Sequence, residues 1–276
     1  MSKLSRKLMV APGQKIRLAK IDPDSTDGVK NRQEAAARLE KSSARLAQLQ
    51  YLLYAEKKRA VLIVFQAMDA GGKDGTIRHV MSGLNPQGCR VIPFKVPVGE
   101  EREHDFLWRI HKATPCFGEI GIFNRSHYED VLVVRVHNLA PKAVWSERYK
   151  HINAFERLLE ESGVKILKFF LHISRQEQQA RLQERLQDRQ KYWKASAADF
   201  EDRKRWNDYM AAYEDVFRRC STAWAPWHII PANKKWYRNL AVSQIIVEAL
   251  EDMNLQLPQP AAEVQTLVAA LPQGHE

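Results

Sequence analysis

The chain has few cysteines and no long apolar run. Its 276 residues include three cysteines, Cys89, Cys116 and Cys220, which are far apart in the sequence and odd in number. Neither a disulfide framework nor a cysteine metal cluster follows from this pattern, and a reducing compartment is the natural one. No apolar stretch approaches the roughly 20 residues needed to span a bilayer. We therefore expect a cytoplasmic protein that does not cross a membrane.

Targeting, repeat and metal-binding signals are also missing. The N-terminal stretch 1–15 is basic but lacks the apolar core, about 7 residues or longer, of a secretion signal. The nine histidines show no metal-binding spacing, and the sequence has no internal repeat. These absences leave an ordinary globular protein whose function must be sought in local motifs.

Positive charge is in excess. Lys and Arg number 43 against 33 Asp and Glu, for a formal net charge of +10. Such an excess favours a polyanionic partner such as a nucleotide, inorganic polyphosphate or nucleic acid, but it can also serve solubility alone. The hydrophobic fraction of 45% and charged fraction of 28% are typical of one large α/β domain or two small ones.

The most informative stretch is VLIVFQAMDAGGKDGT at 61–76. It predicts a buried strand, a turn of small residues and an amphipathic helix. Backbone N–H groups of such a turn, the helix N-terminus and a lysine together bind phosphate oxygens. The residues expected to hold phosphate are those of the turn and the first helical turn: Ala70, Gly71, Gly72, Lys73, Asp74, Gly75 and Thr76.

This stretch departs from the common pattern Gly-x-x-x-x-Gly-Lys-[Ser/Thr]. Ala67 replaces the first glycine, and Asp74 replaces the Ser or Thr that usually binds magnesium. Asp69 places a carboxylate inside the turn, and magnesium is usually held by one or two carboxylates together with phosphate oxygens. We therefore expect Asp69 to be a magnesium ligand. The alternative is a turn that only joins a strand to a helix.

A second polar segment follows the strand expected at 119–123. Many phosphate-loop enzymes have an Asp at the end of a neighbouring strand, where this chain has Asn124, a neutral ligand at best. Glu129 and Asp130 lie just beyond and could contribute through water. Arg125 can reach a phosphate through its bidentate fork, and the alternative is a surface ion pair. The sequence leaves open whether Asn124 or Glu129 completes the metal site.

The third feature is a polar helix that begins after Ser174. Arg181 and Arg185 recur at four-residue spacing and would share one helix face. The segment at about 174–200 could close over a phosphate chain as a lid. The alternative is a solvated helix with local ion pairs.

Strands alternate with helices along the chain. We expect strands at 61–66, 90–96, 119–123, 164–173 and 227–230, and helices at 29–58, 73–84, 100–112, 141–162, from 174 onward, 197–219 and 240–250. Pro93 indicates an edge strand or a bulge. This order predicts an α/β fold, a three-layer α/β/α sandwich with a parallel sheet. Ligands in such sheets lie beyond the carboxyl ends of the strands.

Several motifs together resemble the type-2 polyphosphate kinase family. They are DAGGKDGT at 69–76, FKVP at 94–97, HDFLWR at 104–109, FNRSHYEDVLVVRV at 123–136 and APWHIIPANKKWYRNL at 225–240, in the family's order. The resemblance runs from about residue 28 to 253. Members resemble thymidylate kinases in fold and move phosphate between inorganic polyphosphate and nucleotides with Mg²⁺. We accordingly expect an N-terminal arm at 1–27, a phosphate-loop (P-loop) phosphotransferase domain with a helical lid at 28–253, and a tail at 254–276.

The resemblance also implies roles and partners. Asp69, Lys73 and Arg125 would be catalytic, and Arg181 and Arg185 would bind phosphate from the lid. The nucleotide would contact Asn124, Arg125, Glu129 and Arg135. The expected partners are inorganic polyphosphate and the nucleotides AMP, ADP and ATP, without membrane or nucleic acid, and we expect a homo-oligomer, either a dimer or a tetramer.

One departure from the family bears on the substrate. Many members read Asp-Arg-Ser-Trp-Tyr-Asn where this chain reads NRSHYE at 124–129. This pattern is similar to the subgroup that accepts both nucleoside monophosphates and diphosphates, so Glu129 becomes a candidate for choosing the acceptor. The expected function is a polyphosphate-dependent nucleotide kinase. The alternatives are an ATP-dependent nucleotide kinase and a basic nucleic-acid-binding module, which would need aromatics interleaved with Lys and Arg on one sheet face.

Overall fold

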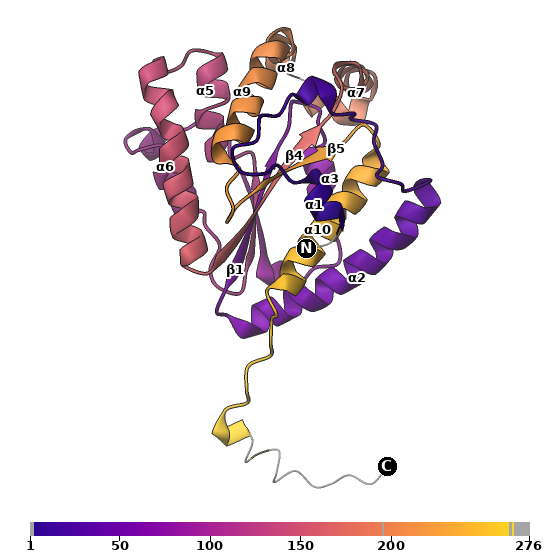
Figure 1. Cartoon of the computed structure of the whole chain (residues 1–276), viewed down its shortest axis with the longest axis vertical. Helices are drawn as coiled ribbons and strands as arrows, with labels where there is room; N and C mark the ends of the chain where they lie inside the picture. The colour runs from indigo at the N-terminus through magenta and orange to yellow at the C-terminus, as the bar shows by residue number, and fades with distance from the viewer. Residues whose placement is uncertain (1–2, 195, 265–266, 268–276) are drawn as a thin grey trace.

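The computed structural model describes residues 3–194, 196–264 and 267 (Figure 1). Its centre is a parallel five-stranded sheet with the strand order β2-β3-β1-β4-β5. The strands are β1 (Ala60–Gln66), β2 (Cys89–Pro93), β3 (Ile120–Asn124), β4 (Val164–His172) and β5 (Trp227–Pro231). All of the strands expected from the sequence are present with small shifts at their ends, and Pro93 ends an edge strand, as expected.

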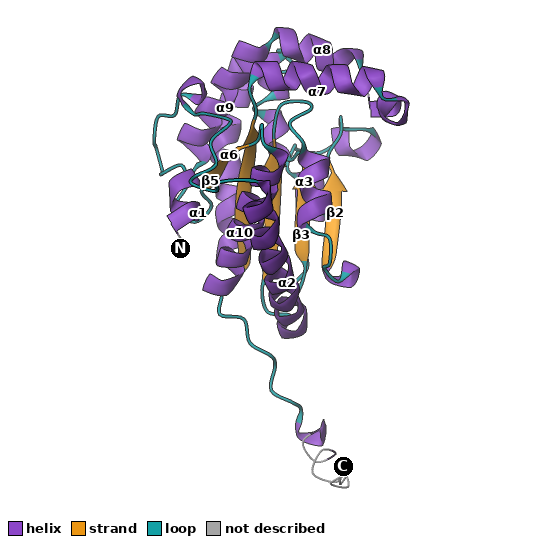
Figure 2. Cartoon of the chain, turned by 90° about the vertical axis from the view of Figure 1, so that its right-hand side faces the viewer, coloured by secondary structure: helices purple, strands orange, loops and turns teal. Residues whose placement is uncertain are grey.

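Helices cover both faces of this sheet (Figures 1 and 2). One face is covered by α2 (Arg32–Glu56), α3 (Lys73–Val80) and α10 (Lys235–Asp252), and the other by α6 (Lys142–Glu161) and α9 (Trp206–Cys220). Alternate residues of β1 therefore enter two separate apolar cores, and every residue of that strand is buried. The three-layer α/β/α sandwich predicted from the sequence is confirmed.

Two expected helices are each split. The helix expected at 100–112 is the 3₁₀ turn η3 (Gly99–Arg102) followed by α4 (Trp108–Lys112), because the Asp105 side chain accepts a hydrogen bond from Leu107 N at 2.9 Å and bends the chain between them. The helix expected at 197–219 is α8 (Ala197–Lys204) and α9. The amphipathic pattern belongs to α9, which buries an apolar face, whereas α8 has no buried residue.

The remaining elements are short or lie at the rims of the sheet. They are α1 (Lys3–Leu8), η1 (Leu18–Lys20), η2 (Pro86–Gly88), η4 (His127–Asp130), α5 (Val133–Val136), α7 (Arg175–Gln187) and η5 (Arg189–Lys194). Helices α7 and α8 lie above the carboxyl ends of the strands, at the top of Figure 2. The lid proposed from the sequence corresponds to α7, η5 and α8.

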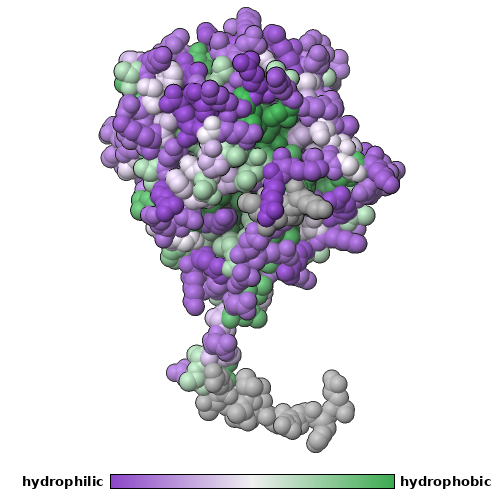
Figure 3. Space-filling view, in the orientation of Figure 1, coloured by the Kyte–Doolittle hydropathy of each residue, from purple (hydrophilic) through white to green (hydrophobic). Residues whose placement is uncertain are grey.

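The N-terminal segment runs along β5 and reaches α10. Val10 N donates to Trp227 O at 2.8 Å, and farther on Asp24 and Asp27 accept hydrogen bonds from Asn233 and Tyr237. The chain after α10 extends away from the sheet (Figure 1). The face of the molecule seen in Figure 3 is largely hydrophilic. Among the described residues, no helix combines the length and the apolar character needed to cross a membrane.

Candidate active site

The glycine-rich turn joins β1 to α3 at the carboxyl end of the sheet. Its tight course depends on two glycines. A Cβ on Gly71 would lie 2.5 Å from Ala67 Cβ and 2.7 Å from Met68 O, and Gly72 has φ +98°, which favours glycine. Gly72 caps α3 and has no side chain, so the cap residue itself offers no acceptor to the first N–H groups of the helix. This arrangement suits an anion. We call residues 67–72 the phosphate loop.

Lys73 begins α3 and folds back over the phosphate loop. Its Nζ donates to Ala67 O at 3.0 Å. Burial lowers the pKa of Lys73, as does the nearby Arg125 charge, while carboxylates around it, including Asp69, act in the opposite direction. Among the described residues, the acceptor recorded for this ammonium is a backbone carbonyl, so phosphate oxygens would offer it stronger acceptors.

Asp69 and Arg125 come together across the sheet edge. Arg125 Nη2 donates to Asp69 Oδ1 at 2.9 Å. Arg125 has φ +64°, an uncommon conformation for a non-glycine residue, and its N–H donates to Phe65 O at 3.1 Å. Burial acts to lower the pKa of Arg125, but the carboxylates of Glu129 and Asp69 outweigh it and raise that pKa. The guanidinium is therefore a permanent charge held beside the phosphate loop.

A buried polar network supports the segment that carries Arg125. Tyr128 Oη donates to Glu156 Oε1 at 2.7 Å, and Lys168 Nζ donates to Glu156 Oε2 at 2.6 Å. His127 Nε2 lies 3.3 Å from Glu156 Oε1. Burial tends to raise the pKa of Glu156, but Lys168 and His127 together lower it below its ordinary value. These hydrogen-bonded buried groups fix the chain directly after Arg125.

A small cavity lies beside the phosphate loop, against α8 and α9. Its lining residues are Ala67, Met68, Asp69, Arg125, Glu129, Val133, Asp202, Tyr209 and Tyr213. Three of these side chains are carboxylates and one is a guanidinium. Burial raises the pKa of Glu129, although Arg125 and Lys73 act to lower it. The excess of carboxylates makes the cavity attractive to a cation.

Asp69 and Glu129 are hard oxygen donors of the kind that Mg²⁺ prefers. Among the described residues, no group of three or more His, Cys, Asp or Glu could hold a metal ion by itself. Mg²⁺ commonly takes only one or two protein carboxylates and completes its shell with phosphate oxygens and waters. The cavity residues therefore fit an ion that binds together with a phosphate chain.

Asn124 and Asp74 face each other between β3 and α3. Asn124 Nδ2 donates to Asp74 Oδ1 at 2.8 Å. Thr76 Oγ1 donates back to Gly72 O at 3.0 Å, so its hydroxyl closes the first turn of α3. Asn124 therefore lies beside the phosphate loop, as the sequence suggests.

Arg181 does not face outward as a lid arginine would. Its side chain is 7% exposed, and its N–H groups make five hydrogen bonds. One goes to Glu177, two to the carbonyls of 70–71 and two to the carbonyls of 232–233. The expected phosphate contact of Arg181 is therefore not supported, because its donors are already used to hold the phosphate loop from behind.

Two other expected arginines lie apart from the loop contacts. Arg185 Nη1 pairs with Asp199 Oδ2 at 3.1 Å and joins α7 to α8. Arg135 Nη1 pairs with Asp215 at 2.8 Å, and its guanidinium lies over the Trp145 ring. Arg135 thus packs against α6 and α9, and the structure does not bring it to Asp69, Lys73 and Arg125.

Arg238, near the start of α10, was missed by the sequence reasoning. It is 3% exposed, and a Cβ built on Gly72 would collide with its Nη1. The only signal that could have found it is its place in the 225–240 motif. Arg238 adds a second buried guanidinium behind the phosphate loop, beside that of Arg181.

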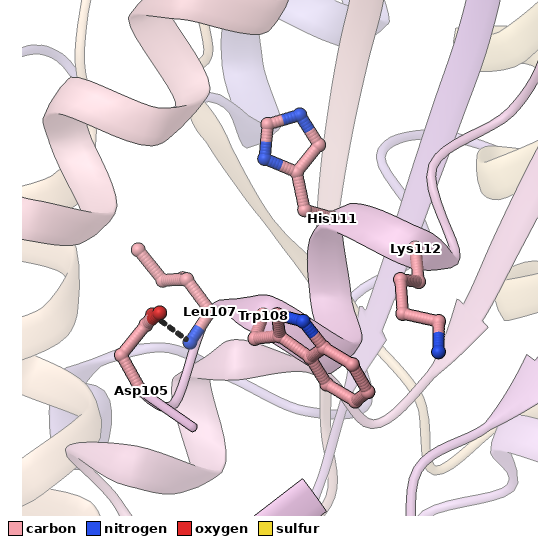
Figure 4. A pocket seen from close by; sticks show the side chains of 5 residues that line it. All are labelled: Asp105, Leu107, Trp108, His111 and Lys112. Carbon is pink, nitrogen blue, oxygen red and sulfur yellow. Dashed lines mark hydrogen bonds between the residues drawn. The ribbon is translucent and has the colours of Figure 1, made fainter.

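A separate hollow lies on the surface at α4 (Figure 4). It is lined by Asp105, Leu107, Trp108, His111 and Lys112. The Trp108 ring lies between the His104 ring, 4.1 Å away between centroids, and Lys112 Nζ, 4.0 Å from its centroid. None of the candidate site residues lines this hollow, so we assign it no part in the site.

The parallel sheet, the glycine-rich loop with Lys73, and Arg125 at the next strand end define a phosphotransferase of the phosphate-loop class. Comparison with known proteins narrows this class. Residues 29–258 match the sequence model of the family described as Polyphosphate kinase 2. The chain belongs to the polyphosphate kinase 2 family.

Individual relatives cover nearly the whole chain. The chain is 53% identical over 264 residues to an AMP/ADP-polyphosphate phosphotransferase of Meiothermus ruber, covering 95% of this chain and 99% of the relative. It is 43% identical over 267 residues to an ADP-polyphosphate phosphotransferase of Rhodopseudomonas palustris, covering 92% of each. The crystal structure of a polyphosphate kinase 2 from Arthrobacter aurescens superposes with a TM-score of 0.91, at 43% identity and 97% coverage of each chain.

Proposed function

We propose that this protein transfers phosphate between inorganic polyphosphate and the nucleotides AMP and ADP. The observation that carries the proposal is the convergence of Lys73, Arg125 and Asp69 on one phosphate loop. The 53% identity to a relative named for AMP and ADP supports the choice of acceptors. ATP is then the end product of two successive transfers.

Phosphoryl transfer depends on positioning and on positive charge around the transferring group. In the proposed mechanism Lys73 exchanges its bond to Ala67 O for phosphate oxygens. Arg125, oriented by Asp69, faces the transferring phosphoryl group and stabilises the charge that develops there. When bound, Mg²⁺ supplies further neutralisation of phosphate charge, and Asp69 is the first candidate to hold it.

The proposed function also gives roles to Glu129 and Arg185. Glu129 lines the cavity beside Asp69, so its carboxylate would sense the charge of the acceptor. Arg185, on the surface of α7, could exchange Asp199 for a phosphate as the α7–α8 segment closes. We further propose a cytoplasmic enzyme that works as a dimer or a tetramer.

The donor decides between this function and an ATP-dependent nucleotide kinase. We expect the purified protein to convert AMP to ADP and then ATP with polyphosphate and Mg²⁺, in the absence of ATP. Lys73→Met should fold normally and lose turnover by on the order of 100-fold or more, because it removes the charge at the phosphate loop. Chromatographic separation of the nucleotides measures both reactions.

The controls exclude the other functions. Product that forms only when ATP replaces polyphosphate would contradict the proposal, and so would turnover by Lys73→Met at the parent rate. A protein that binds oligonucleotides tightly but forms no nucleotide product would instead be the basic binding module.

A further inference from the structure

Arg238, like Arg181, is a strongly buried guanidinium against the phosphate loop, and the proposed mechanism gives it no role. It is 3% exposed and lies near the start of α10. A Cβ on Gly72 would collide with its Nη1, and a Cβ on Gly75 would lie 3.5 Å from its Nη2. The backbone that begins α3 therefore passes directly over this guanidinium.

The hydrogen bonds of Arg238 are few for a buried charge. Its Nε and Nη2 both donate to the same atom, Asn239 Oδ1, at 3.1 Å and 2.8 Å. No ion pair with a carboxylate is recorded for it within the described residues. Arg181, its neighbour behind the same loop, makes five hydrogen bonds. The two guanidiniums thus differ sharply in how well the protein compensates them.

The surroundings of Arg238 disfavour its charge. Burial, and then the positive charge of Arg181, lower the pKa of Arg238 to about 10. A buried charge without a counter-ion destabilises a fold unless something else balances it. The guanidinium lies against the backbone of the phosphate loop at Gly72, and the ligand of that loop would be an anion.

We propose that Arg238 is a positioning residue of the phosphate loop, and that the phosphates bound in the loop supply the negative charge that the protein itself does not provide. The inference rests on the proposed function in one respect, that the anion is a phosphate chain. Arg238 destabilises the empty protein and favours the occupied loop, acting through the backbone at Gly72 and Gly75. This is a trade of stability for binding.

The test is Arg238→Met, which keeps much of the side-chain volume and removes the charge. We expect the empty variant to melt at a higher temperature than the parent. Its KM for polyphosphate should rise by roughly tenfold, the effect of one charged interaction, with a smaller change in kcat. The upward shift in melting temperature that inorganic polyphosphate or ADP causes in the parent should shrink in the variant. Arg238→Lys, which keeps a positive charge, should recover part of the loss in KM.

Arg45→Met is the matched control, because Arg45 pairs with Glu251 near the end of α10, whereas Arg238 lies near its start. It should leave KM and the ligand-induced shift unchanged. A lower melting temperature for Arg238→Met, or a failure to fold, would overturn the proposal, since the charge would then stabilise the fold. Equal ligand-induced shifts in parent and variant would overturn it while leaving the proposed function intact. If neither polyphosphate nor ADP raises the melting temperature of the parent, the proposed function and this inference both fail.

Discussion

At the scale of single residues, the two cations of the site are each held by an internal acceptor. Lys73 bonds to Ala67 O, and Arg125 bonds to Asp69. Each bond keeps the side chain at the phosphate loop before a ligand arrives, which lowers the entropy lost on binding. A phosphate chain then needs only to replace or share these acceptors. The loop, Lys73 and the Asp69 and Arg125 positions follow from local motifs, and so they could be read from the sequence.

Glu129 gives a prediction about pH. Its pKa is raised by burial, so it loses its proton as pH rises through that raised value. The resulting negative charge should disfavour ADP, which carries one more phosphate than AMP. We expect the ratio of ADP rate to AMP rate to fall with rising pH in the parent, and Glu129→Gln to keep a ratio up to roughly tenfold higher at the alkaline end. Initial rates from about pH 5 to about pH 9 measure this, with the variant reporting how the substrates themselves titrate. Superimposable profiles would show that Glu129 does not choose the acceptor.

At the scale of elements, α7 supports the phosphate loop and does not simply cover it. The four-residue spacing of its arginines correctly predicts a shared helix face, but not where that face points. Arg181 is buried because carbonyls at 70–71 and 232–233 meet behind the loop. Those segments are far from Arg181 in the chain, so no local pattern can reveal them. The splits at 103–107 and at Arg205 have local causes instead, the bond from Leu107 N to Asp105 and a turn closed by Arg205 N and Asp202 O.

Arg181→Met should therefore lower the stability of the fold, whereas Arg238→Met should raise it. The substitution removes the Arg181 donors from four backbone carbonyls, two at 70–71 and two at 232–233, and from Glu177, and unpaired buried polar groups are costly. We expect the free energy of unfolding to fall by about 2–4 kcal/mol, a scale typical of breaking a buried charged network. Urea or thermal unfolding measures it. An unchanged stability would mean that Arg181 is free to serve a ligand, as its spacing alone suggests.

At the scale of the whole molecule, the net charge of +10 should draw in a long polyanion. Long-range attraction is screened over about 8 Å at physiological ionic strength, so it weakens as salt is added. We expect KM for long-chain polyphosphate to rise steeply with KCl, and KM for AMP to rise much less, because AMP has few charges. Parallel salt titrations of both constants test this at fixed Mg²⁺. Equal salt dependence of the two would show that only local contacts attract the polymer.

The order of the fold along the chain has a consequence for biosynthesis. The phosphate loop is among the first parts of the sheet to be made, but the groups behind it come from Arg181, 232–233 and Arg238. A ribosome releases the recognisable motif long before it releases these supports, and domains form as units once their parts are available. The growing chain therefore contains the whole phosphate-loop motif while it still lacks the residues that hold the loop in its folded conformation. We expect the chain to bind phosphate only after α10 has left the ribosome and packed against the sheet.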